Sequence, residues 1–276
     1  MTAFDSESRH SADRWWKLAV LVAVPAAVAA VLTFHGGAAL IAPDLWWRAL
    51  VHTDNSVASE LLFRHAYAPR VAVSILAGLG LGLSGVLLQH ILRNPLAEPT
   101  TVGTNAGAGL ALTVATLYAP HLLESGRSAV AMAGGAASML LVFLLASRLR
   151  FSPVAVIVSG LVTSLTCGSA GALLMAINRE YTEDLFIWQS GSLVQNGDAV
   201  AKALLPQLLA CGLLAFLFLR PLRLLDAGDE AARSLGLRPA IVRLAGLAIA
   251  VAASTFVVSA AGVISFVALA APAFAR

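Results

Sequence analysis

The polar residues that could take part in chemistry lie mostly inside long apolar runs. Residues 82–85, GLSG, have the G-x-S-G pattern in which a serine such as Ser84 can serve as the nucleophile of an intramembrane serine protease. Such a serine needs a histidine on another helix to accept its proton. No apolar run further along the chain contains a histidine, and the pattern arises easily by chance in a Gly-rich span. Ser84 is therefore a weak candidate for a nucleophile.

The sequence also lacks the common patterns for nucleotide or catalytic metal binding. Walker A, HExxH and GxGxxG motifs are all absent. The six histidines have no ligand spacing, and Cys167 and Cys211 lie apart in apolar runs, where small core residues are expected. We therefore expect no enzymatic activity, no bound cofactor and no metal site in this chain.

The composition indicates that a membrane must position these residues. Hydrophobic residues make up 59% of the chain and charged residues 12%, against about 25% charged residues in an ordinary soluble domain. A helix needs about 20 apolar residues to cross a bilayer core. After a tail at 1–17, this length predicts spans at 18–41, 71–92, 128–146, 154–177, 201–219 and 240–261.

Two shorter apolar runs, 103–118 and 263–275, contain Gly or Pro and suit transporter helices buried inside a bundle. With the longer runs they predict an all-α polytopic membrane protein of about eight helices. Small residues recur at four-residue spacing in two of these runs, which predicts close helix packing. These rows are Ser74, Gly78 and Gly82 in one run and Gly103 and Gly107 in the other.

The basic residues favour a membrane orientation over nucleic-acid binding. The net charge is +3, but Lys and Arg flank apolar runs and form no stripe with interleaved aromatic residues. With the N-terminus in the cytoplasm, 12 of the 18 basic residues fall on the cytoplasmic side and 6 outside, as the positive-inside rule requires. The stretches 93–101 and 226–237 are then cytoplasmic, and 178–198 lies outside.

The stretch LLDAGDEAARSLGLRP, 224–239, reads as a short charged helix between two spans. Asp226 is a suitable N-cap, Asp229 and Glu230 place negative charge in the first turn, and Gly236 is a suitable C-terminal residue. A helix of about nine residues is marginal alone in water, where about 12 to 15 are needed. We therefore expect it to dock on a cytoplasmic partner, although a solvated connector would have the same sequence features.

Five sequence blocks resemble one family of transport proteins. They are PRVAVSILAGLGLGLSGVLLQHILRNPLAEPTTVGTNAGAGL (69–110), SPVAVIVSGLVTSLTCG (152–168), WQSGSL (188–193), GDEAARSLGL (228–237) and GVISFVALAAPAFAR (262–276). The blocks and their spacing resemble the iron-siderophore permeases of type II ABC importers, the FecCD/BtuC-like family. Within that family they are most similar to the N-terminal half of the ferric hydroxamate permeases, in which two halves are fused.

The resemblance implies the type II ABC importer permease fold, a bundle of ten helices, of which about eight fall within the transmembrane domain 18–276. It implies a ferric siderophore as cargo, most closely ferric hydroxamate, carried across the bacterial inner membrane. The implied partners are a second permease half, fused or dimeric, a periplasmic siderophore-binding protein, and cytoplasmic ABC ATPase subunits that bind ATP and Mg.

The resemblance also assigns roles to residues of this sequence. A bulky polar chelate suits a wide, weakly binding path lined by hydroxyl and amide groups, although each hydroxyl could equally bond a neighbouring helix. Ser152 and Pro153 correspond to the cytoplasmic gate, Arg64 and Arg70 are candidates for docking the binding protein, and Arg93, Asn94 and Pro95 form a cytoplasmic loop. The expected path residues are Ser74, Ser84, Gln89, Ser159, Thr163 and Ser164, and the expected ATPase-coupling residues are Asp226, Asp229, Glu230, Ala231, Ala232, Arg233, Leu235 and Gly236.

Some positions differ from the family pattern, and other functions remain open. Ala268 and Ala273 stand where the family usually has Gly and His, and Tyr67 stands where vitamin B12-type members have a second Arg beside Arg70. A permease for haem or vitamin B12 is the nearest alternative. A rhomboid-like intramembrane serine protease or a channel is a distant one, and neither would depend on a partner ATPase.

Overall fold

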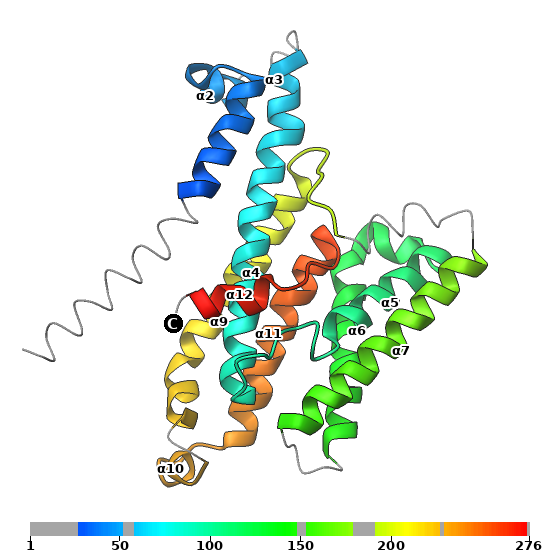
Figure 1. Cartoon of the computed structure of the whole chain (residues 1–276), viewed down its shortest axis with the longest axis vertical. Coiled ribbons are helices and arrows are strands. Elements are labelled where there is room, and N and C mark those ends of the chain that lie inside the picture. Colours follow the sequence, from blue (N-terminus) through cyan, green and yellow to red (C-terminus); the bar gives the residue numbers. More distant parts are fainter. Residues whose placement is uncertain (1–26, 52–57, 148–152, 179–190, 227–228, 275–276) are drawn as a thin grey trace, which may run out of the picture.

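The computed structural model describes residues 27–51, 58–147, 153–178, 191–226 and 229–274, and the regular structure within them is helical (Figure 1). A first helix covers Ala27–Leu40. The following elements are η1 (Pro43–Leu45), α2 (Trp46–Val51), α3 (Ala58–Leu62), the π-helical turn η2 (Phe63–Tyr67), α4 (Ala68–Leu92), α5 (Thr104–Tyr118), α6 (His121–Ser147), α7 (Pro153–Ile177), α9 (Ala199–Asp226), α10 (Asp229–Ser234), α11 (Pro239–Ala261) and α12 (Val267–Phe274).

The membrane-length helices fall where the apolar runs predict them. Five helical stretches among the described residues are long and apolar enough to cross a bilayer. They are Ala58–Leu92, Gly126–Ala146, Val154–Ile177, Ala199–Leu225 and Pro239–Ala261. These stretches confirm the five predicted spans from 71–92 onward.

The first predicted span, 18–41, is described only from residue 27. There the helix Ala27–Leu40 is followed by a second helical piece, Pro43–Val51, bent by 87°. Pro43 at the start of η1 lacks a backbone N–H and cannot continue the preceding helix, which accounts for the bend.

The two short apolar runs form short helices, as predicted. α5 has 15 residues and α12 has 8, lengths of about 22 Å and 12 Å at 1.5 Å per residue. Both are shorter than the roughly 30 Å hydrocarbon core. In Figure 1, α12 crosses the middle of α4, and the segment between α4 and α5 rises from the lower end of α4 to where α5 begins.

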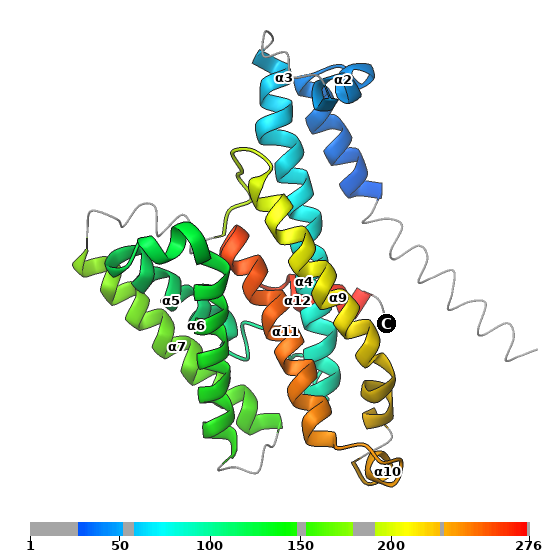
Figure 2. The same cartoon turned by 180° about the vertical axis from the view of Figure 1, so that it is seen from behind.

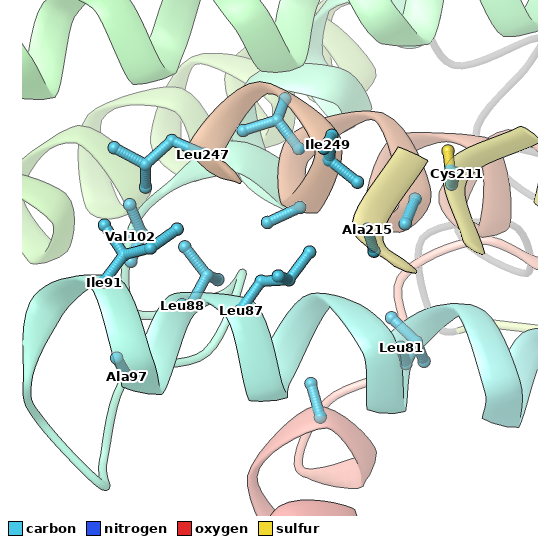
Figure 3. Close-up of a cluster of buried hydrophobic side chains, with 14 of the residues drawn as sticks. Leu81, Leu87, Leu88, Ile91, Ala97, Val102, Cys211, Ala215, Leu247 and Ile249 are labelled. Atoms are coloured by element: carbon cyan, nitrogen blue, oxygen red, sulfur yellow. The ribbon is translucent and has the colours of Figure 1, made fainter. Parts of the chain in front are cut away.

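Helix α11 is the most enclosed of the five membrane-length stretches. Its most apolar window is 61% buried inside the chain, against 44% for Ala58–Leu92. It packs against α4 and α9 on one side and α5 and α6 on the other, while α7 packs on α5 and α6 (Figures 1 and 2). The main apolar core lies along this axis. Figure 3 shows Leu87 and Leu88 of α4 directed toward α11, beside Cys211 and Ala215 of α9.

The close helix packing on α4 does not use the predicted row. A Cβ at Gly78 would have nothing within 4 Å, and one at Gly82 would be 3.5 Å from Ala271 Cβ, so neither glycine is needed for contact in this chain. A Cβ at Gly85 would instead lie 1.9 Å from Ala268 O, where the α12 backbone crosses α4. The prediction was wrong by about one turn, because the crossing of α12 could not be placed from the sequence.

The predicted row on the next run is confirmed at Gly107. A Cβ there would lie 2.4 Å from Ser138 Cβ of α6, so the two helix backbones approach closely at this point. Gly103 lies just before α5 with φ 83°, and its carbonyl accepts a hydrogen bond from Ser138 Oγ at 3.0 Å. The small residues of this run therefore set the packing of α5 on α6.

Candidate functional site

The three predicted path residues on α4 lie against the chain's own helices. Ser84 is fully buried, and its Oγ donates to Ala250 O of α11 at 2.8 Å. Ser74 Oγ donates to Val71 O of its own helix at 2.8 Å, and Gln89 is buried. A main-chain carbonyl cannot act as a general base, so the geometry at Ser84 gives the intramembrane protease alternative no support.

The hydroxyls of α7 meet a different part of the chain. Thr163 is buried and its Oγ1 donates to Ser159 O at 2.8 Å, within the same helix. Ser164 Oγ donates to Thr100 O at 2.9 Å, in the segment that leads from α4 to α5. This segment passes close to α7, because a Cβ at Gly160 would lie 2.1 Å from Thr101 O. Among the predicted path residues, Ser84 thus bonds to α11 and Ser164 to the segment before α5, whereas Ser74 and Thr163 bond within their own helices.

A cavity of about 250 Å³ lies beside the α7 group. Its walls come from the segment before α5, the first turns of α5, the middle of α7 and the chain before α12. The lining residues are Thr100, Asn105, Ala106, Gly109, Leu110, Ser164, Cys167, Gly168 and Val263.

Asn105 is the polar residue of this cavity that the sequence reasoning missed. It is 1% exposed, and neither its amide oxygen nor its amide nitrogen has a hydrogen-bond partner among the described residues. An enclosed amide without a partner costs about 1–3 kcal/mol. A signal existed, because Asn105 is an amide within the apolar run 103–118, and a polar group inside a membrane segment indicates function or pairing.

The loop after α4 is fixed to the end of α9. Arg93 adopts the left-handed conformation that ends α4, with φ 49°, and its Nη2 donates to Leu225 O at 2.7 Å. Asn94 N donates to Gln89 O at 3.1 Å, and Asn94 Oδ1 accepts from Leu96 N at 2.9 Å, one residue past Pro95. The predicted cytoplasmic loop therefore forms a compact turn in contact with the residues that precede α10.

The predicted charged helix is shorter than expected. Asp226 is the last residue of α9, and α10 covers only Asp229–Ser234. The prediction that Asp226 is an N-cap was wrong, because Leu222 and Leu225 are buried and extend α9 to this point. Gly236 ends the segment with φ 80°, and Leu237 N donates to Ala232 O at 3.0 Å, which closes the turn as expected.

The side chains of this segment face in different directions. Ala232 is fully buried in the chain's own apolar core, so its expected contact with a partner is corrected. Glu230, Arg233, Gly236 and Leu235 are exposed, and Leu235 keeps 63% of its surface free. The side chains of Asp226, Asp229, Ala231 and Pro153 and the whole of Ser152 lie outside the described residues, although Pro153 begins α7.

The opposite end of the chain carries the two candidate docking arginines. The helical stretch Ala58–Leu92 has 35 residues, about 52 Å at 1.5 Å per residue. It is longer than the roughly 30 Å bilayer core, so the end bearing α3 extends past α5, α6, α7, α9 and α11 and lies beside α2 (Figure 1). Both arginines lie on the extended helix, Arg64 in η2 and Arg70 near the start of α4. Arg70 is exposed and Arg64 is partly buried.

Arg64 lies near an acidic group. The loop before α9 is tied to the extended helix, because Gly197 N donates to His65 O at 2.7 Å. Asp198 pairs with Lys202 at 2.6 Å, and the hydrogen bond from Lys202 holds the pKa of Asp198 below its usual range, with a smaller contribution from Arg64.

A second cavity, of about 480 Å³, opens at this same end between α6, α9 and the end of α11. It is lined by polar groups that include Arg127, Gln195 and Gln207. No group of three or more His, Cys, Asp or Glu residues within the described parts of the chain is placed to hold a metal ion.

Residues 22–276 match the FecCD transport family. The chain belongs to this family. The chain is 32% identical over 268 residues to the Fe(3+) dicitrate transport system permease protein FecD of Escherichia coli K12. This alignment covers 94% of this chain and 81% of that protein. It is 41% identical over 259 residues to the iron(3+)-hydroxamate import system permease protein FhuB of the same organism.

The FecCD match extends to structure. A solved metal-chelate type ABC transporter in an inward-facing conformation superposes with a TM-score of 0.66 and 26% identity, covering 86% of this chain and 77% of that one. The match confirms the predicted permease fold. The alignment with the E. coli FhuB includes 94% of this chain but only 39% of that protein. The alignment with the Salmonella typhimurium FhuB includes 34% of that protein.

Proposed function

We propose that this FecCD-family chain forms part of the permease of an ABC importer that carries ferric siderophore, most closely ferric hydroxamate, across the inner membrane of a bacterium. The observation that carries the proposal is the 41% identity to the hydroxamate permease FhuB along 94% of the chain. The fold match to a metal-chelate ABC transporter supports the same class of cargo. ATP and Mg bind to separate ATPase subunits.

The ends of the molecule suit the two kinds of partner. α10 and the Arg93 turn lie at one end, and exposed Leu235 and Arg233 offer an apolar and a charged contact to an ATPase groove. Arg70 lies on the extended helix at the other end, where a carboxylate of a binding protein can pair with it. A second permease half, fused or separate, completes the path.

The basic residues support an orientation with the N-terminus in the cytoplasm. The orientation assigns 12 of the 18 basic residues of the sequence to the side that bears α10 and 6 to the other side, and cytoplasmic ends carry the excess of Lys and Arg. Among the described residues, the side with α10 includes Arg93, Arg220, Arg223, Arg233, Arg238 and Arg243.

Uptake in cells tests the proposal directly. The complete natural polypeptide, with its own ATPase and binding protein, is expressed in a strain that lacks ferric hydroxamate uptake, and ⁵⁵Fe accumulation is measured. We expect uptake of ferric hydroxamate that is lost when the P-loop lysine of the ATPase is replaced. Ferric citrate, a ferric catecholate, haem and vitamin B12 are compared in the same cells. Uptake of one of these in place of hydroxamate would refute the cargo, and uptake independent of the ATPase would refute the importer.

A further inference from the structure

The cavity between α5 and α7 lies where the start of a short helix meets the middle of α7, a membrane-length helix. α5 is about 22 Å long at 1.5 Å per residue, so a helix of 15 residues cannot cross the core. Its N-terminus lies beside the cavity, because Asn105 and Ala106 of its first turn both line it. Interrupted helices of this kind place their N-termini at substrate sites in several transporters.

The first turn of α5 presents backbone donors to the cavity. Thr104 N donates to Pro99 O and Gly107 N to Gly103 O, both at 3.1 Å. Between them, the N–H groups of Asn105 and Ala106 have no hydrogen bond with any residue that the structure describes. The N-terminal end of a helix carries partial positive charge and binds oxygen acceptors through such groups.

The Asn105 side chain is an independent sign of a ligand. Asn105 is more than nine-tenths buried and lines the cavity. Neither its amide oxygen nor its amide nitrogen has a hydrogen-bond partner within the described residues. The other polar groups of the cavity are already engaged. Ser164 Oγ donates to Thr100 O, and Thr100 Oγ1 donates to Glu98 Oε1. The unused groups at this place are therefore mainly donors.

Glu98, the acidic residue near this cavity, favours a neutral ligand with many oxygen atoms over a free anion. Glu98 is buried two residues before Thr100 and would repel a free anion. Three monoanionic hydroxamates bound to Fe³⁺ give a complex of no net charge whose oxygens still accept hydrogen bonds. Such a complex matches the donors of α5 without opposing Glu98.

We propose that the start of α5 binds the oxygen face of the ferric chelate during its passage through the membrane. This inference rests on the proposed function. The chelate oxygens accept hydrogen bonds from the N–H groups of Asn105 and Ala106 and from Nδ2 of Asn105, a residue that lines the cavity. A cavity of about 250 Å³ is smaller than the roughly 300–1,000 Å³ sites that enclose whole ligands. It therefore holds one edge of the chelate and leaves the remainder in the path.

Two substitutions at Asn105 separate this role from a purely structural one. Asn105→Leu removes the amide at similar volume, and Asn105→Asp keeps the size but replaces a donor with negative charge. Asn105 is 1% exposed, so a carboxylate there can also lower stability by burying charge. Uptake is therefore expressed per transporter present in the membrane, and a purely structural role predicts that this value stays at the wild-type level. Binding of chelate oxygens predicts that Asp lowers uptake at least as much as Leu. We expect ⁵⁵Fe uptake of a ferric trihydroxamate about threefold to tenfold lower in both variants.

Thr116→Val is the matched control on the same helix. Thr116 Oγ1 donates to Leu112 O within α5, and Thr116 does not line the cavity, so wild-type uptake is expected. Uptake at the wild-type rate in both Asn105 variants would overturn the inference. Absence of any ferric chelate uptake by the wild-type transporter would instead refute the proposed function.

Cys167 gives a second readout that does not depend on transport rate. It lines the same cavity, whereas Cys211 is buried in the core. Labelling is therefore read by mass spectrometry at the peptide that contains Cys167, in a Cys211→Ala background. A methanethiosulfonate reagent is applied to the assembled transporter with and without ferric trihydroxamate delivered by the binding protein. We expect the chelate to slow Cys167 labelling in the wild type and to have no effect in Asn105→Asp. Equal labelling rates with and without chelate in a wild type that transports would overturn the inference.

Discussion

The hydroxyl groups of the membrane helices have the same chemistry in the sequence but different places in the structure. Ser84 bonds across to α11, Ser74 bonds back to its own helix, and Ser164 bonds to Thr100 beside a cavity. A hydroxyl between packed helices stabilises the bundle, whereas one beside a cavity can contact a solute. We therefore expect substitutions of these serines to have different effects.

Ser84→Ala should lower the stability of the transporter with little specific loss of uptake. The lost hydrogen bond to Ala250 O is worth about 0.6 kcal/mol on average, and at most about 1.7 kcal/mol, between membrane helices. Thermal unfolding in detergent measures the change. Ser74→Ala is the control, because its bond lies within one helix, and it should unfold as the wild type does. A large fall in uptake by Ser84→Ala at wild-type stability would show that Ser84 belongs to the path instead.

Gly85→Ala should destabilise the contact between α4 and α12. The added Cβ would lie 1.9 Å from Ala268 O, and overpacking of this kind costs about 1–3 kcal/mol. Gly78→Ala is the matched control on the same helix, because nothing lies within 4 Å of its added Cβ. Alanine there should leave stability unchanged or raise it by up to about 1 kcal/mol through helix propensity. Equal unfolding temperatures for the two variants would contradict the observed crossing.

The element most closely linked to the proposed ATPase contact is the segment from the end of α9 to the start of α11. Arg93 holds the end of α9 through Leu225 O, and Ala232 packs into the core. α10 has only six residues, too few to be stable alone, so these contacts must maintain its position. A movement of this segment is thereby coupled to α4, α9 and α11.

Arg93→Ala should reduce uptake by loosening the end of α9. A hydrogen bond from a charged donor contributes about 1.5–3 kcal/mol. Arg93→Lys keeps a charged donor and should restore part of the loss. The measurements are ⁵⁵Fe uptake and co-purification of the ATPase. Wild-type uptake by Arg93→Ala would show that the turn is held in place by its backbone bonds alone.

Ala232→Glu and Leu235→Glu should fail in different ways, although they lie three residues apart. Ala232 is fully buried, and an unpaired charge there costs several kcal/mol. The expected result is a low membrane level. Leu235 is 63% exposed, so its variant should reach the membrane normally and lose the ATPase. A Leu235→Glu transporter that keeps the ATPase and its transport rate would mean that α10 is only a solvated connector.

At the scale of the whole molecule, the two ends differ in shape. One end presents α10 and the Arg93 turn, and the other presents the extension of α4 through η2 and α3 (Figure 1). The loop before α9 braces this extension through His65 and places Asp198 near Arg64. Arg70 is therefore the better candidate for an intermolecular ion pair.

Arg70→Glu should slow association of the binding protein and reverse the effect of salt on the rate. Rim charges act mainly through the association rate. Arg64→Gln should have the smaller effect, because Arg64 is partly buried whereas Arg70 is exposed. Stopped-flow mixing at low and high salt measures both variants. Unchanged association of Arg70→Glu at low salt, with normal insertion, would assign Arg70 to anchoring the helix at the interface.

The sequence by itself determined that the protein is a helical membrane protein and where its membrane helices lie from 71–92 onward. Apolar run length and the shortness of 103–118 and 263–275 were sufficient, because hydrophobic burial in a bilayer is a local property of the chain. The positive φ that ends the charged segment at Gly236 was also predictable, since glycine adopts it without strain.

Only the tertiary structure decided which side chains meet. The Arg93 bond to Leu225 O joins residues 132 positions apart, and the Ser84 bond to Ala250 O spans 166. The place where α12 crosses α4 put the tight contact at Gly85 and not at Gly78 or Gly82, and the packing of α9 turned Ala232 inward. The unpaired amide of Asn105 became visible only once α5 and α7 formed a cavity around it. Each of these depends on how separate helices rotate and cross, and helix periodicity alone does not specify those rotations.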